Sequence, residues 1–162
     1  MTSQILTDQA EAKHALDAWV RLLRGHTAAR RTLDASLQAD YGLTVTGYEA
    51  LLLLSAAGEK RLRRVDLAEG LALTASGVTR LLDGLEADGL VAKETCPSDL
   101  RATYAVVTEA GRARLDAASC SHVRSVRALF EERYTPDELE TLASLLQRLP
   151  GAGGADASEC TP

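Results

Sequence analysis

The first 42 residues contain a helical stripe of apolar side chains that also includes one histidine and one arginine. The stripe recurs at alternating spacings of three and four residues and consists of Leu16, Trp19, Leu23, His26, Arg30, Leu33 and Leu37. This period predicts one helix of about eight turns, which begins with a capping box of Asp8 and Glu11 and ends near Ala39. Because a helix this long cannot fold back on a small domain over its whole length, we expect residues 1–42 to form part of a dimer interface.

A second helix and a helical pair follow. A capping box of Thr46 and Glu49 predicts a helix that contains the leucines at positions 51–54 and stops at Gly58. Residues 65–70 are predicted as a short helix and residues 71–74 as a turn, with Thr74 as the N-cap of the next helix. A glycine stop at Gly89, followed by an apolar residue, is typical of a Schellman-type helix end. The inward face of this last helix consists of Val78, Leu81, Leu82 and Leu85.

The outer face of the same helix carries small or polar residues, namely Ala75, Ser76, Thr79, Arg80 and Asp83. Two short helices joined by a tight turn, the second of them small and polar in its N-terminal half, are typical of a helix-turn-helix that enters the major groove of DNA. Arg80 is long enough to reach a guanine edge or a phosphate.

Two β-rich stretches, residues 90–95 and 103–107, come directly afterwards. The turn formers Pro97, Ser98 and Asp99 join them, so the sequence predicts a hairpin wing beside the helix-turn-helix. Asp99 and Arg101 at the tip are expected to pair, which would hold the guanidinium where a narrow minor groove receives it. The alternative is an ordinary solvated salt bridge at a loop tip.

Two more helices complete the pattern. Thr108 is the predicted N-cap of the first, and residues 135–138 (Thr-Pro-Asp-Glu) form a full start signal for the second. We expect residues 111–149 to be dimerisation helices and residues 150–162 to be a disordered tail. The predicted fold class is therefore mainly α with a small β-hairpin wing: a winged helix-turn-helix over residues 43–110 with N- and C-terminal dimerisation helices.

The net charge of −5 argues at first against a nucleic-acid partner, but the charges are unevenly distributed. Residues 131–162 hold seven acidic side chains against two arginines, whereas residues 60–80 hold five basic side chains against two acids. Local charge decides where phosphates bind, so we expect double-stranded DNA to meet this basic segment, including Arg63 and Arg64. The alternative is that residues 60–64 form only a solvent-exposed turn.

Composition and the absence of certain motifs argue against membrane proteins, disulfide-rich or metal-binding proteins, and enzymes. No stretch approaches the roughly 18 consecutive apolar residues of a membrane span, and residues 1–10 lack the features of a signal peptide, so we expect a cytoplasmic protein without membrane contact. Cys96, Cys120 and Cys160 are too widely spaced for a disulfide framework or a metal-ligand pair, and Cys120 is expected to be a small packed residue. Phosphate-binding and nucleophile motifs are also absent, which predicts no enzyme, no cofactor and no metal.

Residues 43–115 resemble the MarR (multiple antibiotic resistance regulator) family. The matching segments, in order, are VDLAE at 65–69, SGVTRLLD at 76–83, LE-x-x-GLV at 85–91, D-x-R at 99–101 and VT-x-x-G at 107–111. Two positions depart from the family pattern. Leu100 stands where the family often has the first of two wing-tip arginines, which weakens the expected grip on the minor groove. Val65 stands where a polar N-cap is common, leaving Asp66 to serve the helix start.

The resemblance implies a homodimer with interleaved terminal helices, in which each lobe reads half of a palindromic operator. It implies a transcriptional regulator, here expected to be a repressor, which a small-molecule effector releases from DNA. The residues expected to bind DNA are Arg63, Arg64, Thr74, Ala75, Ser76, Thr79, Arg80 and Arg101, with Asp99 supporting the wing tip.

In the family the effector site lies between the first helix, the helix-turn-helix and the helix after the wing. Members that sense urate-like or organic-acid ligands are similar to this chain in having a tryptophan on the first helix and an acid opening the third, here Trp19 and Asp66. Together with His26 and Arg30, Trp19 would suit a planar carboxylate, since the ring stacks and the guanidinium pairs with the acid. The alternatives are that Trp19 anchors the dimer interface and that His26 makes only a polar contact.

Two other functions stay open. A thiol-based redox-sensing regulator is one, although related thiol sensors place the reactive cysteine near the N-terminus and none precedes Cys96 here. A winged helix used only for protein contacts is the other, and it would leave Ser76, Thr79 and Arg80 without a role. Zinc sensing is disfavoured because His14, His26 and His122 are scattered along the chain.

Overall fold

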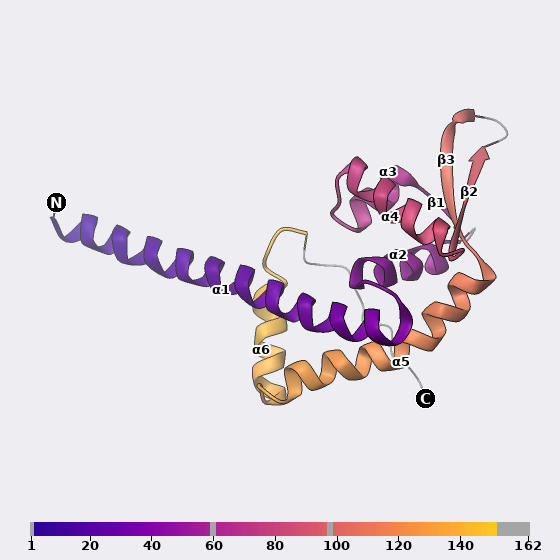
Figure 1. Cartoon of the computed structure of the whole chain (residues 1–162). Helices are drawn as coiled ribbons and strands as arrows, with labels where there is room; N and C mark the ends of the chain where they lie inside the picture. Colours follow the sequence, from indigo (N-terminus) through magenta and orange to yellow (C-terminus); the bar gives the residue numbers. More distant parts are fainter. Residues whose placement is uncertain (1, 59–60, 97–98, 152–162) are drawn as a thin grey trace.

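The chain, described in a computed structural model, consists of a winged helical lobe attached to long helices (Figure 1). The structure describes the backbone of residues 2–58, 61–96 and 99–151, and the side chains of residues 13–58, 61–94 and 103–151. The predicted mainly helical fold with a small β wing is confirmed. The elements in chain order are α1 (Thr2–Tyr41), α2 (Val45–Ala56), β1 (Arg61–Arg63), α3 (Arg64–Gly70), α4 (Ala75–Ala87), β2 (Val91–Cys96), β3 (Asp99–Val107), α5 (Glu109–Glu131) and α6 (Pro136–Leu146).

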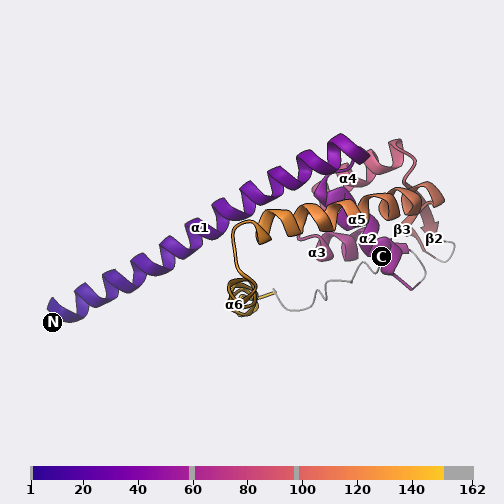
Figure 2. The same cartoon turned by 90° about the horizontal axis from the view of Figure 1, so that it is seen from below.

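Helix α1 extends away from the rest of the chain at its N-terminal end, as Figures 1 and 2 show from two directions. Its C-terminal part contacts α5, while α6 lies across the far end of α5. The predicted helix start at Asp8 is wrong, because the helical backbone already runs from Thr2 and Asp8 therefore lies inside the helix. No helix in the described part of the chain is long and apolar enough to cross a membrane.

The hydrophobic core lies where α2, α4, the sheet and α5 meet. Leu51 and Leu54 of α2, Val78 and Leu82 of α4, and Leu115 of α5 are all buried there. The inward face predicted for α4 is thus confirmed at Val78, Leu82 and Leu85, with Leu81 partly buried against the core. Because this core fixes one face of α4, the opposite face of that helix is turned outward.

Local capping signals define most helix starts. Thr74, Thr108 and Thr135 each accept a hydrogen bond from the backbone N–H three residues later, and Glu138 completes the predicted capping box at α6. At the end of α4, Gly89 has φ +70° and Leu90 N donates to Leu85 O at 2.9 Å, which is the predicted Schellman end.

The predicted capping box of Thr46 and Glu49 is wrong. The N-cap of α2 is Thr44, whose Oγ1 accepts from Gly47 N at 3.0 Å. A second N–H of the first turn, that of Val45, donates to Asp34 Oδ1 of α1 at 2.7 Å. Since Asp34 and Thr44 already hold the free N–H groups of the first turn, the side chains of Thr46 and Glu49 are available to contact Arg30 instead.

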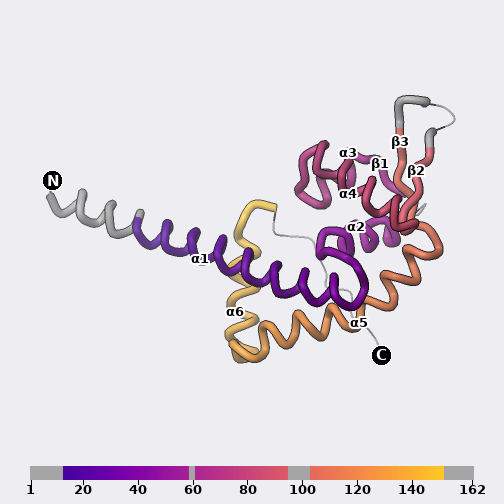
Figure 3. The backbone as a smooth tube through the Cα atoms, in the orientation of Figure 1, coloured from indigo at the N-terminus to yellow at the C-terminus, as the bar shows by residue number. Residues whose placement is uncertain are grey.

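The sheet is antiparallel with the strand order β1-β3-β2, so β3 lies in the middle. Strands β2 and β3 form the predicted wing; β2 is shifted by one residue from the predicted stretch, and β3 begins four residues earlier than predicted. Strand β1 was not predicted; it pairs with β3 in the register Arg61↔Val106 and Arg63↔Tyr104. The tube in Figure 3 shows how this sheet places the wing next to α4. The predicted disordered tail lies, from residue 152 onward, outside the described residues.

Candidate DNA-binding surface

The outward face of α4 is small and polar, as predicted. Thr74 caps the helix by accepting from Gly77 N at 3.1 Å, and its hydroxyl lies 3.2 Å from that of Ser76. Thr79 Oγ1 donates back to Ala75 O within the helix, at 3.0 Å. The backbone of the first turn is therefore covered only by hydroxyls and a methyl group, which permits close approach to a groove.

Arg80 extends from this face as an exposed cation. It makes no ion pair or hydrogen bond with any residue whose side chain the structure describes. A guanidinium in this state keeps all its donors for an external acceptor. Arg64, at the start of α3, is also exposed and equally unpaired within the described ranges.

Arg63 is in a different state. Its Nε and Nη2 donate to the two carboxylate oxygens of Asp66, both at 3.1 Å, which is a bidentate pair. This hydrogen bonding lowers the pKa of Asp66 and raises the pKa of Arg63. The structure thus joins a predicted DNA-binding residue to a predicted ligand-binding residue. Asp66 stands in the first turn of α3, as predicted, but the N-cap is Arg63 and not Val65, which lies inside the helix; Arg63 makes no side-chain cap.

The wing stands beside α4, but its tip is only partly described. The strands pair up to Cys96↔Asp99, with an irregularity in register between Thr95 and Cys96. The side chains of Asp99 and Arg101 lie outside the described residues, so their expected pairing stays a prediction. At the base of the sheet, the guanidinium of Arg61 lies 4.9 Å above the ring centroid of Tyr104.

Sequence reasoning missed an ion cluster between the wing and α4. Lys93 of β2 reaches Asp83 Oδ1 at 2.6 Å and Glu86 Oε2 at 2.7 Å. The hydrogen bond to Asp83, and then that to Glu86, raises the pKa of Lys93. The only sequence signal for this cluster is that two acids one turn apart on a helix precede a lysine on the following strand.

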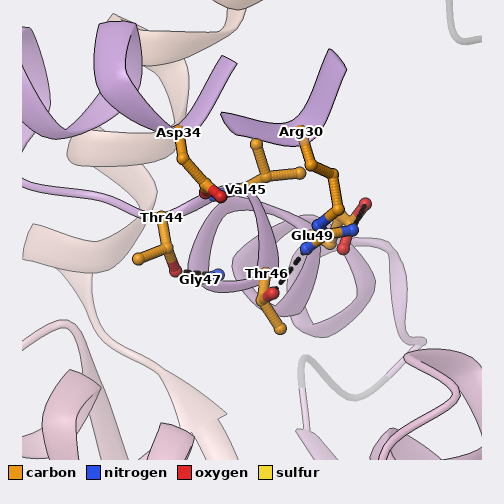
Figure 4. Close-up of polar contacts among 7 residues, drawn as sticks. All are labelled: Arg30, Asp34, Thr44, Val45, Thr46, Gly47 and Glu49. Carbon is orange, nitrogen blue, oxygen red and sulfur yellow. Dashed lines mark hydrogen bonds and ion pairs between the residues drawn. The ribbon is translucent and has the colours of Figure 1, made fainter. Parts of the chain in front are cut away.

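The residues predicted to bind an effector lie along α1. Trp19 and His26 are exposed, and Arg30 is partly covered by α2. Figure 4 shows Arg30 directed at α2, where Nη2 donates to Thr46 Oγ1 at 2.6 Å and Nη1 lies 3.6 Å from Glu49 Oε1. One turn further along α1, Asp34 accepts from Val45 N. Arg30 and Asp34 therefore fasten α1 to the first turns of α2.

A pocket lies away from the predicted effector residues, between the end of α1 and the first half of α5. Arg114 Nη1 donates to Tyr41 O across it at 2.5 Å. None of the four predicted ligand residues lines it; the lining consists of Asp40, Tyr41, Gly42, Ala110, Ala113, Arg114 and Ala117.

Helix α5 also presents a polar side chain, that of His122, to α2. The ring of His122 packs against Tyr48, with centroids 4.6 Å apart, and Tyr48 Oη donates to Ser119 Oγ at 3.2 Å. Burial lowers the pKa of His122. On the same helix Cys120 is exposed, so the prediction of a packed cysteine is wrong.

Known proteins resemble the part of the chain that carries the candidate DNA-binding surface. Residues 41–102, from the end of α1 to the wing, match the model of the MarR family. The transcriptional repressor YetL of Bacillus subtilis (strain 168) is 32% identical over 108 residues, which cover 67% of this chain and 64% of YetL.

Solved structures extend the similarity to most of the chain. Sco3205, a MarR family transcriptional regulator from Streptomyces coelicolor solved in complex with DNA, is 31% identical with a TM-score of 0.75, over 84% of each chain. CouR from Rhodococcus jostii RHA1, solved with bound p-coumaroyl-CoA, is 26% identical with a TM-score of 0.68, over 86% of this chain and 94% of that chain.

Proposed function

The chain belongs to the MarR family of DNA-binding transcriptional regulators, and from this premise we propose that it is a homodimeric repressor whose hold on a palindromic operator is loosened by a small anionic or aromatic ligand. Residues 43–110 form the DNA-binding lobe in this proposal. Residues 1–42 and 111–149 form the dimer interface. The repressor role is supported by the similarity to YetL.

The observation that carries the DNA-binding site is the outward face of α4. It combines a small, hydroxyl-lined first turn with an unpaired arginine, while its other face is locked into the core. Arg64 adds an exposed cation at the start of α3. Arg63 contributes less charge, because Asp66 neutralises it. The proposed DNA-binding residues are Arg63, Arg64, Thr74, Ala75, Ser76, Thr79, Arg80 and Arg101, with Asp99 as support for the wing tip.

Replacing Arg80 with alanine tests this site. If Arg80 reads a base edge, Arg80→Ala weakens binding to the operator by about 1–3 kcal/mol and relaxes the preference at one half-site position. The measurement is fluorescence anisotropy with a duplex that the wild-type protein selects from a random-sequence library. Ala56→Glu lowers the net charge by one at an exposed position at the end of α2, outside the proposed DNA-binding and dimer residues, and serves as the control. Equal affinity of the Arg80 and Ala56 variants for the operator would show that α4 does not contact DNA.

The effector site is proposed around Trp19, His26 and Arg30, with Asp66 as a further member. The similarity to CouR supports a bound organic ligand for a chain of this fold. Arg30 already contacts Glu49 and Thr46. A ligand carboxylate that pairs with Arg30 would therefore compete with Glu49 and weaken one of the two contacts that fasten α1 to α2. Such competition would give the ligand different affinities for the free and the DNA-competent shapes, as any release of DNA requires.

Fluorescence of the single tryptophan tests the effector site without a label. Titration with benzoate, urate and short organic acids is expected to quench Trp19 for at least one compound, and the same compound should release DNA. A hundredfold loss of operator affinity corresponds to about 2.7 kcal/mol of coupling. Trp19→Phe is the companion variant. If a compound releases DNA, leaves Trp19 emission unchanged and acts normally on Trp19→Phe, the effector site lies elsewhere and Trp19 is an interface anchor.

A further inference from the structure

The C-terminal half of α4 carries two acids close to its outward face. Asp83 follows Ser76 by seven residues and Arg80 by three, so these three positions share one side of the helix. Glu86 lies one turn beyond Asp83. Both carboxylates remain partly exposed. A DNA backbone that runs along this face would bring phosphates toward two negative charges, which opposes binding.

Lys93 contacts both of these carboxylates from a different element. Strand pairing fixes the position of Lys93 on β2, since it lies opposite Ala105 of the central strand. Its Nζ then lies 2.6 Å from Asp83 Oδ1 and 2.7 Å from Glu86 Oε2, within charge-assisted hydrogen-bond distance of each. Asp83 and Glu86 make no other ion pair among the residues described. One ammonium group on the wing thus holds both acids of α4 on the side that faces β2.

We propose that Lys93 is a positioning residue for DNA recognition, which masks Asp83 and Glu86 from the DNA phosphates and so makes the C-terminal half of α4 compatible with a nucleic-acid backbone. The inference rests on the proposed DNA-binding role of α4. It assigns to Lys93 an effect on affinity without direct contact with DNA. The reason is electrostatic: without the ammonium group, both carboxylates are free to turn outward with their full charge.

The test compares four variants on the duplex selected by the wild-type protein. Lys93→Met is expected to weaken binding about tenfold at about 50 mM salt and progressively less as salt rises, because salt screens the exposed carboxylates. Lys93→Arg keeps the charge and should bind within about threefold of the wild type. The triple variant Lys93→Met/Asp83→Asn/Glu86→Gln removes the masking lysine and also the two negative charges that would repel DNA. It is therefore also expected to bind within about threefold of the wild type. Ala56→Glu lowers the net charge by one at an exposed position at the end of α2, outside α4, the wing and the proposed dimer segments, and is the control for net charge.

Recovery of DNA affinity in the triple variant is the decisive readout. If Lys93 only connected β2 to α4, the triple variant would lack that connection too and would bind DNA as weakly as Lys93→Met. A triple variant as weak as Lys93→Met would overturn the inference, as would a loss that stays constant between low and high salt. Failure of the wild-type protein to enrich any duplex would instead overturn the DNA-binding role itself, and the inference with it. Thermal unfolding of each variant confirms that the proteins compared are folded.

Discussion

Gly111→Ala is expected to destabilise the protein by about 3 kcal/mol or more, a large part of the roughly 5–15 kcal/mol that holds a domain together. Gly111 lies in the first turn of α5, where the helix meets the start of the wing. A Cβ at this position would lie 2.1 Å from Leu90 O and 2.9 Å from Val107 Cγ2. The first of these contacts is with backbone, so no side-chain rotation can relieve it.

The junction around Gly111 leaves little freedom to adjust. Leu90 O accepts from Thr108 N at 3.0 Å, and Thr108 Oγ1 accepts from Gly111 N at 3.0 Å while donating to Gly89 O at 2.8 Å. Moving α5 away from Leu90 would break these bonds between the end of α4, the wing and α5. The glycine of the motif at residues 107–111 is therefore required by a close approach of helix and backbone.

Gly84→Ala is the matched control for this substitution. Gly84 lies inside α4, and a Cβ added there would have no heavy atom of another residue within 4 Å beyond its own helix backbone and chain neighbours. Alanine at this position should therefore stabilise the helix by up to about 1 kcal/mol. Urea unfolding at one protein concentration measures both variants. A Gly111 variant as stable as the wild type would show that α5 does not pack on Leu90 in solution.

Local signals explain why much of the fold could be predicted from the sequence. The caps at Thr74, Thr108 and Thr135 depend on side chains and N–H groups three residues apart, and the end of α4 depends on one glycine with positive φ. Each of these interactions is complete within one turn. The apolar period of α4 likewise fixes its inward face without reference to any distant segment.

Tertiary contacts account for what the sequence did not reveal. Thr46 and Glu49 match a capping box, but Asp34, eleven residues before Val45, supplies a competing acceptor from α1. Strand β1 is only three residues long and exists through its pairing with β3, which lies far along the chain beyond two helices and a strand.

In the candidate DNA-binding site, too, local features could be predicted from the sequence and tertiary contacts could not. The outward face that carries Arg80 follows from helical period alone. The Arg63–Asp66 pair and the position of Lys93 could not be predicted, because charge partners depend on rotamers and on strand register. The assignment of DNA-binding and effector residues stays a prediction that the variants above will test.

Charging the apolar stripe of α1 is expected to have the largest effect on function. Leu16, Trp19 and Leu23 are 62%, 56% and 45% exposed, and α6 contains no buried residue. Apolar surface of this extent on two helices is typical of an interface, and we propose that a second copy of the chain covers it. Leu16→Glu/Leu23→Glu should therefore give a monomer in analytical ultracentrifugation.

The loss of the dimer should also reduce operator affinity about a hundredfold or more, because two linked lobes bind a palindrome far more tightly than one. Ala18→Glu/Gly25→Glu is the control: it adds the same two charges with the same spacing to the opposite side of α1, where both positions are exposed. This control should stay dimeric and bind DNA. A stripe variant that remains dimeric would place the interface on other surfaces. A stripe variant that is monomeric yet binds the operator at full affinity would show instead that each lobe binds DNA alone. The proposal of a palindromic operator read by a dimer would then be wrong.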